Sequence, residues 1–166
     1  MSSEGIFQIA LILATFLCSL VAGFLLAFAL VVMPGIKSLN DSDFIRAFQV
    51  MDRIIQNNQP FFVSLWVGSV VALIIATVLG IAQFETRYIL IIFATLAYLL
   101  GVQLPTITIN IPLNNKIQTL DVDTMSETMQ RAFRQDFESR WNLWNSIRTV
   151  FASLASALLI ILLFMI

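Results

Sequence analysis

The sequence contains no histidine in its 166 residues and only one cysteine, Cys18. The absence of histidine excludes His-ligated haem, zinc and non-haem iron sites, together with any nucleophile activated by a histidine base. A single cysteine excludes an intrachain disulfide. The net charge of -1 and the lack of a basic tract exclude a nucleic-acid partner. Chemistry in this chain must therefore use carboxylates, amides, arginine, tyrosine or bound water, and we expect neither a metal nor a cofactor.

Charged residues are also scarce, at 11% of the chain, whereas 59% of the residues are hydrophobic and the mean hydropathy is +0.91. Apolar stretches lie at about 6–33, 61–84, 88–111 and 146–166. Each supplies the roughly 20 residues that cross a hydrocarbon core of about 30 Å, and helices satisfy their own backbone groups in lipid. The sequence therefore predicts an all-α membrane protein, a single four-helix transmembrane domain surrounded by membrane lipids.

The connections between these spans differ greatly in length and charge. Only Glu85, Thr86 and Arg87 separate the second span from the third, whereas the first and third connections are long. Of the nine Lys and Arg residues, all except Arg87 lie in or beside the two long connections. Because positive charge accumulates on the cytoplasmic side, we expect both long connections in the cytoplasm and both termini outside.

The first connection is predicted to contain an amphipathic helix. Pro34 and Gly35 are expected to end the first span, and a polar residue among 41–43 is expected to cap a new helix that runs to about Asn58. Apolar residues recur there at steps of three and four, which gives the helix one apolar face: Phe44, Phe48, Met51 and Ile55.

The third connection follows the same pattern on a larger scale. Thr124 and Glu127 form a capping-box pattern, which predicts a helix start near Met125. No glycine or proline occurs from there to Ile166, so this helix should continue unbroken into the membrane. Its apolar stripe comprises Met129, Phe133, Phe137, Trp141 and Trp144. The two amphipathic connecting segments should lie on one side of the bundle.

Polar residues cluster at the end of the third span, in "TITINIPLNN". Gln103, Thr106 and Asn110 share a helix face, and Pro112 is predicted to end the helix, which leaves Asn114 in the following turn. Polar groups inside a bilayer are costly and often functional. The alternative is that these residues only form interhelical hydrogen bonds and cap a loop.

A second polar cluster, "WNLWNSIRT", opens the last span. Trp141, Asn145 and Arg148 share a face, and Asn142 lies one turn before Asn145. The tryptophans also suit the aromatic belt at a membrane surface, and Arg148 also suits a snorkelling position. Neither explanation accounts for the two asparagines.

If the third and fourth helices turn these faces toward each other, Asn110, Asn145 and Arg148 surround one polar pocket. Amide donors and a fixed cation can hold a carbonyl oxygen or stabilise an oxyanion, so these three are the candidate catalytic residues. The residues beside them are candidates for binding a ligand: Thr106, Asn114, Trp141, Asn142 and Trp144.

Acidic residues offer only one candidate proton acceptor, Asp52, on the first amphipathic segment. The alternative for Asp52 is a solvated salt bridge with Arg53 or Arg131. The sequence favours the salt bridge.

Four sequence elements together resemble the DUF1772 family of small four-span membrane proteins, also called anthrone oxygenase-like. They are "GFLLAFALVVMPGI", "FQVMD...QPFF", "TITINIPLNN" and "WNLWNSIRT". The resemblance covers the whole chain, and the positions that match the family pattern are Asn110, Pro112, Asn114, Trp141, Asn145 and Arg148. Gln59 stands where the family usually has asparagine before Pro60. The resemblance implies a relation to fungal proteins that oxidise anthrones to anthraquinones with molecular oxygen and without a recognised cofactor.

Two functions are consistent with these observations. One is a membrane protein that binds or oxidises a flat lipophilic aromatic molecule, anthrone-like or quinone-like, with oxygen and without a metal. The other is a non-catalytic structural or accessory subunit of a larger membrane complex. The first requires the polar residues to face a cavity, and the second requires them to be satisfied by one another.

Overall fold

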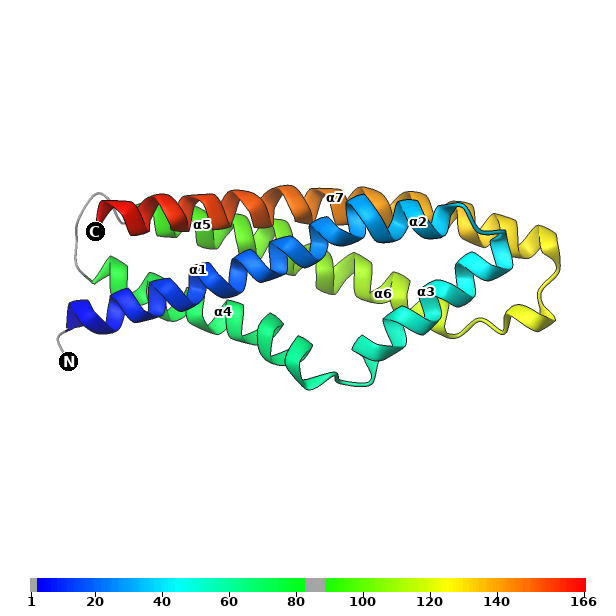
Figure 1. Ribbon diagram of the computed structural model, residues 1–166, viewed down its shortest axis with the longest axis horizontal. Coiled ribbons are helices and arrows are strands. Elements are labelled where there is room, and N and C mark those ends of the chain that lie inside the picture. The colour runs from blue at the N-terminus through cyan, green and yellow to red at the C-terminus, as the bar shows by residue number, and fades with distance from the viewer. Residues whose placement is uncertain (1–2, 83–88) are drawn as a thin grey trace.

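The computed structural model of the protein describes residues 3–82 and 89–166, which form helices and no strand (Figure 1). Four of the helical stretches are long and apolar enough to cross a membrane: Glu4–Lys37, Pro60–Ile81, Ile89–Gln118 and Glu127–Met165. The predicted all-α, multi-pass architecture is thereby confirmed. The short second connection, including Arg87, lies outside the described residues.

The first and third spans are each built from several helical elements. The first contains α1 (Ser3–Ala27), the π-helical turn η1 (Phe28–Val32) and α2 (Met33–Lys37). The third contains α5 (Ile89–Tyr98), the π-helical turns η3 (Leu99–Gln103) and η4 (Thr106–Asn110), and α6 (Ile111–Gln118). The remaining elements are α3 (Asp41–Gln56), α4 (Pro60–Ile81), the short 3-10 helix η5 (Val122–Thr124) and α7 (Glu127–Met165).

Prolines do not end these spans, contrary to the prediction. The first helix continues past Pro34 to Lys37, and the third continues past Pro112 to Gln118. Pro34, Pro105 and Pro112 each lie two residues beyond a π turn. Proline lacks the N–H that an α-helix uses and displaces the carbonyl four residues back, and the wider turn makes room for that carbonyl. The helix therefore absorbs each proline instead of stopping.

Two hydrophobic cores follow one another along the bundle. The first lies between α1, α4, α5 and α7 and is formed by fully buried residues such as Phe7, Leu11, Leu73 and Leu159. The second lies where α3 covers the end of the bundle, and its centre contains Phe44, Phe48, Ile117, Phe137 and Trp141. Large apolar side chains also remain exposed along all four spans, as expected for a surface in contact with lipid.

Both amphipathic segments are helical, and both begin at a different residue from the one predicted. Asn40 caps α3 by accepting a hydrogen bond of 2.9 Å from the Asp43 N–H. Ser126 caps α7, because Thr124 belongs to the preceding η5. The unbroken last helix is confirmed, but Met129 is 59% exposed and does not belong to its buried stripe.

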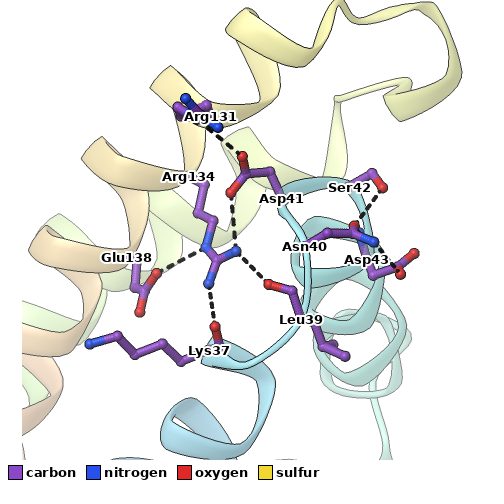
Figure 2. Close-up of polar contacts among 9 residues, drawn as sticks. All are labelled: Lys37, Leu39, Asn40, Asp41, Ser42, Asp43, Arg131, Arg134 and Glu138. Carbon is purple, nitrogen blue, oxygen red and sulfur yellow. Dashed lines mark hydrogen bonds and ion pairs between the residues drawn. The ribbon is translucent and has the colours of Figure 1, made fainter.

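The two long connections lie at one end of the bundle and the two termini at the other (Figure 1). At the connection end, Arg134 of α7 reaches the end of the first span, where its guanidinium donates to the carbonyls of Lys37 and Leu39, each at 2.7 Å. It also pairs with Asp41 and Glu138, both at 3.1 Å (Figure 2). A single side chain thus ties α7 to α2 and to the start of α3.

Candidate functional site

A cavity of about 160 Å³ lies where the bundle meets α3. Its walls come from α1, α3, α4, the η4–α6 segment and α7, and most of them are aromatic or aliphatic. The apolar lining residues are Phe24, Leu25, Phe28, Phe48, Met51, Ile55, Phe62, Trp66, Ile111 and Trp141, and the polar ones are Asp52, Thr106, Asn110, Asn114, Asn145 and Arg148. The third and fourth helices therefore do turn their polar faces toward one space.

Arg148 is the buried cation of this cavity, with 4% of its surface exposed. Its guanidinium donates to the Thr106 hydroxyl and to the Asn145 amide oxygen, each at 3.1 Å, and it lies 5.8 Å from the ring centre of Trp141. None of the ion pairs among the described residues includes Arg148, and its Nε has no partner there. The positive charge thus lacks a balancing carboxylate.

Asn110 lies one turn beyond Thr106 and is 2% exposed. Neither its amide nitrogen nor its amide oxygen has a hydrogen-bond partner among the described residues. A buried amide usually has partners, because leaving one polar atom unpaired costs about 1–3 kcal/mol. Asn110 and Arg148 therefore do not satisfy each other, and both keep unused hydrogen-bonding capacity beside the cavity.

Asp52 is the carboxylate of the cavity, and it is 4% exposed. Its Oδ1 accepts from Asn114 Nδ2 at 2.8 Å, and its Oδ2 accepts from Gln118 Nε2 at 2.9 Å and from Gln56 Nε2 at 3.1 Å. The alternative of a solvated salt bridge is wrong, since Arg131 pairs with Asp41 and the Asp52 partners are amides. A carboxylate offers about four lone-pair positions, so Oδ1 retains one that these donors do not use.

Asn114 and Asn145 hold the walls of the cavity together. Asn114 donates to Asp52 and accepts from Trp141 Nε1 at 2.9 Å, which joins α3, α6 and α7. Asn145 accepts from Arg148 and donates to the Leu25 carbonyl at 3.1 Å, which joins α7 to α1. Both amides fix the positions of charged or aromatic neighbours.

Thr106, Asn110, Asn114 and Gln118 follow one another at intervals of four residues and form a polar ladder along the third span. Thr106 contacts Arg148 at one end of the ladder, and Asn114 and Gln118 contact Asp52 at the other. At the α-helical rise of 1.5 Å per residue, Thr106 and Asn114 lie at most about 12 Å apart along the helix axis, because η4 is a wider π turn. The cavity therefore has a positive end and a negative end, with the unpaired Asn110 between them.

Two of the predicted residues lie outside this cavity. Asn142 is half-buried and does not line it. Trp144 lines an apolar groove on the outer side of α7 instead, together with Pro105 and Phe151. Gln103 accepts a hydrogen bond of 2.9 Å from Trp66 Nε1, and therefore faces α4.

Sequence reasoning missed Gln56 and Gln118, which hold Asp52. Gln56 is four residues after Asp52, and Gln118 is four after Asn114, so each continues a helix face that already carries a site residue. The spacing of Gln118 was not recognised because the helix was expected to end at Pro112. The first span contributes Phe24 of α1 and Phe28 of η1 to the wall, and neither is a polar residue that could have marked this contribution.

One known protein family matches the part of the chain that carries this cavity. A sequence model of the family described as anthrone oxygenase matches residues 51–158. The chain belongs to the anthrone oxygenase family. The resemblance to DUF1772 proteins is thereby confirmed. Neither the curated proteins nor the solved structures include a match to the chain.

In this anthrone oxygenase family member, the matched segment begins one residue before Asp52 and includes every polar residue that lines the cavity. Within the described residues, no three carboxylate or cysteine side chains lie together as metal ligands would. The donors present are amides, a hydroxyl and a guanidinium, which suit a carbonyl or an oxyanion.

Proposed function

We propose that this anthrone oxygenase family member binds a flat lipophilic aromatic molecule, anthrone-like or quinone-like, in the cavity and oxidises it with molecular oxygen. The observation that carries the proposal is the unused hydrogen-bonding capacity of Arg148 and Asn110 inside an apolar space. An unpaired buried cation and amide are costly in a membrane protein. A ligand oxygen placed between them would remove that cost.

The walls of the cavity suit such a ligand. Aromatic rings line it from four helices, including Phe28 and Phe48 against Trp141 at centroid distances of 5.6 Å and 5.4 Å. A cavity of about 150 Å³ lined by apolar residues encloses one benzene ring. The present cavity, at about 160 Å³, is therefore the size of one ring. A tricyclic ligand whose central ring lies between the two charged ends would place one outer ring at the open side and displace the aromatic wall on the opposite flank.

The reaction converts an anthrone and O₂ into an anthraquinone and water. The methylene carbon first loses a proton, for which Asp52 Oδ1 is the acceptor, and the negative charge moves to the carbonyl oxygen beside Arg148 and Asn110. The enolate gives one electron to O₂, and the two radicals then join through a carbon–oxygen bond to form a peroxide. Loss of the second methylene hydrogen as a proton, with cleavage of the O–O bond and release of water, leaves the second carbonyl.

The spacing of the two charged groups supports this arrangement. The carbonyl oxygen and the methylene carbon lie on opposite sides of one ring, and together with a contact of about 3 Å at each end they span about 10 Å. The polar ladder separates the partners of Arg148 and Asp52 by at most about 12 Å. Arg148 and Asn110 are thus proposed to stabilise the oxyanion, and Asp52 to accept the proton.

Anthrone-dependent oxygen consumption tests this function in the purified, lipid-reconstituted protein. Arg148→Gln should reduce the rate by about 10²–10³-fold, the usual effect of removing an oxyanion donor. Arg140→Gln is the matched control, because Arg140 is 56% exposed and pairs only with Asp136 among the described residues. No rate above the protein-free background in the wild type would refute the oxidation.

The alternative function, an accessory subunit of a larger membrane complex, predicts a different result. No aromatic molecule should then co-purify in native mass spectrometry, and substitution of Asn110, Asn145 or Arg148 should reduce stability equally. The unpaired Asn110 favours the ligand-binding function, because a purely structural amide would be expected to have a partner.

We also propose that the end of the bundle with the long connections faces the cytoplasm, because Lys and Arg are concentrated there. Cysteines introduced into these connections should react with an impermeant thiol reagent only after the cells are opened. Labelling of intact cells would reverse the assignment.

A further inference from the structure

The cavity is closed on the side where α3 lies across the bundle. Gln49 of α3 donates to the carbonyls of Ile117 and Leu120 at 2.8 Å and 3.0 Å. Further along α3, Asp52 binds its two α6 amides, and Gln56 donates to Asn115 at 3.0 Å. These contacts join α3 to the third span along two turns, so α3 forms a sealed cover over the cavity.

Ring contacts close two further sides. Phe24 of α1 meets Phe62 of α4 at a centroid distance of 5.3 Å, and Phe48 of α3 meets Trp141 of α7 at 5.4 Å. Deeper in the bundle, the hydrogen bond from Trp66 to Gln103 connects α4 to the third span. Nothing comparable joins the described parts of α4 to η4 or α6, or to α3 apart from the short connection 57–59, because α4 packs mainly on α1 and α5.

The least closed side therefore lies along the first turns of α4, and Phe62 of α4 and Ile111 at the start of α6 both line the cavity. Its rim is apolar and partly exposed, with Phe62 half-buried and Ile111 43% exposed. Apolar residues beside the rim are more exposed still, including Phe61 at 82% and Ile107 at 63%. At 1.5 Å per residue, the 22 residues of α4 span about 33 Å, close to the thickness of the hydrocarbon core. The first turns of α4 thus lie at the edge of the hydrocarbon.

We propose that ligands enter and leave this cavity sideways from the lipid, between α4 and α6, while α3 stays closed. The ligand class is a neutral, lipid-dissolved aromatic molecule, and its identity as a substrate rests on the proposed function. Lateral entry is consistent with the charged groups at the inner ends of the cavity and with apolar Phe62 and Ile111 at its rim. A water-dissolved ligand would instead have to pass beneath α3 and break the amide contacts with α6.

Fluorescence of Trp141 provides the test, because this residue lines the cavity and is only 4% exposed. The protein carries Trp66→Phe and Trp144→Phe, so that Trp141 is the only tryptophan, and is reconstituted in phosphatidylcholine vesicles. Bromobenzene dissolved in the lipid is the quencher, and aqueous iodide is the polar comparison. Quenching by bromobenzene but not by iodide is expected.

Two chemical modifications, made after the protein has folded, distinguish entry from the lipid from entry beneath α3. In Gln56→Cys/Asn115→Cys protein, a short thiol cross-linker fixes α3 to α6, and the same sample is compared before and after cross-linking. In Ile111→Cys protein, a bulky maleimide fills the rim. Ile107→Cys, one turn earlier on the lipid-exposed face, is the matched control. Native Cys18 is fully buried and should not react.

Lateral entry predicts that the cross-link leaves the rate of bromobenzene quenching unchanged, whereas the label at Ile111 lowers it several-fold and the label at Ile107 does not. Loss of quenching on cross-linking, or equal rates for the two labels, would overturn the proposal. Bromobenzene needs neither Arg148 nor Asp52 for recognition. Failure of the proposed function would therefore appear separately, as the absence of saturable anthraquinone binding in a protein that still admits bromobenzene.

Discussion

Asn110 offers the sharpest test of whether the cavity awaits a ligand, because its substitution should stabilise the protein while removing its function. Both polar atoms of the Asn110 side chain are buried without partners among the described residues. Asn110→Leu removes them and keeps the length and branching of the side chain. Each unpaired atom costs about 1–3 kcal/mol, so the ligand-free protein should gain about 2–6 kcal/mol in its free energy of unfolding.

Asn145→Leu is the matched comparison, since Asn145 lines the same cavity and is equally buried, with 1% exposed. Its amide makes two hydrogen bonds, to the Leu25 carbonyl and from Arg148. The first of these joins two helices, and interhelical hydrogen bonds in membranes are worth about 0.6 kcal/mol on average and up to about 1.7, whereas the second lies within α7. Loss of both, with the carbonyl and the guanidinium left unpaired, should lower the free energy of unfolding by about 1–3 kcal/mol.

Equilibrium unfolding in mixed micelles measures both effects, and anthraquinone binding is followed in parallel through tryptophan fluorescence. The two leucine variants should shift stability in opposite directions, and both should lose binding. A loss of stability in Asn110→Leu as large as in Asn145→Leu would refute the reasoning. Asn110 would then be a structural amide, and the accessory-subunit function would gain support.

Three further predictions concern other parts of the molecule. Asp52→Asn places an amide N–H opposite the amide donors that now bind the carboxylate, so it should lower the free energy of unfolding by about 1–3 kcal/mol. It should also reduce anthrone-dependent oxygen consumption by about 10²–10⁴-fold. A wild-type rate would exclude Asp52 as the proton acceptor. Gly101→Ala places a methyl group against the ring of Phe151 and should lower the free energy of unfolding, measured by thermal unfolding, by about 1–3 kcal/mol. Gly23→Ala, whose added methyl group would have no atom within 4 Å, should leave the free energy of unfolding unchanged. Arg134→Ala removes the Arg134 contacts drawn in Figure 2 and should lower the free energy of unfolding by about 2 kcal/mol. Arg131→Ala, whose side chain is 72% exposed, should lower it by less than about 0.5 kcal/mol. Equal losses would show that the carbonyl contacts of Arg134 contribute nothing to stability.

The four spans could be predicted from the sequence because a bilayer imposes a length and a composition that few other structures share. The convergence of Asn110, Asn145 and Arg148 on one cavity followed from helical spacing combined with the cost of polar groups in lipid. These inferences depend on physical constraints that act along a single helix, and a sequence displays them directly.

The features that sequence analysis missed depend on contacts between distant segments or on local exceptions to helix geometry. A π turn adds a residue to a helical turn and leaves no compositional mark, so the continuation past Pro112 to Gln118 could not be foreseen. The environment of Asp52 depends on α3 crossing α6, and helical periodicity does not specify which helices cross. Trp144 was wrongly predicted to bind a ligand because nearby residues in the sequence, such as Asn145, line the cavity. Its own side chain lines a different groove.

The wall that the first span contributes to the cavity can vary in sequence without loss of a polar site residue. The side chains that the first span supplies are apolar, namely Phe24 and Leu25 of α1 and Phe28 of η1. Its polar contact with the site comes from a backbone carbonyl that any residue at position 25 would provide. The wall from α1 also lies outside the segment that the anthrone oxygenase family defines. Substitutions there can reshape the space offered to a ligand without disturbing Asp52, Asn110 or Arg148. Under the proposed function, this part of the wall can therefore change the shape of the cavity without changing its polar groups, although other apolar wall residues, such as Phe62 and Trp141, lie within the matched segment.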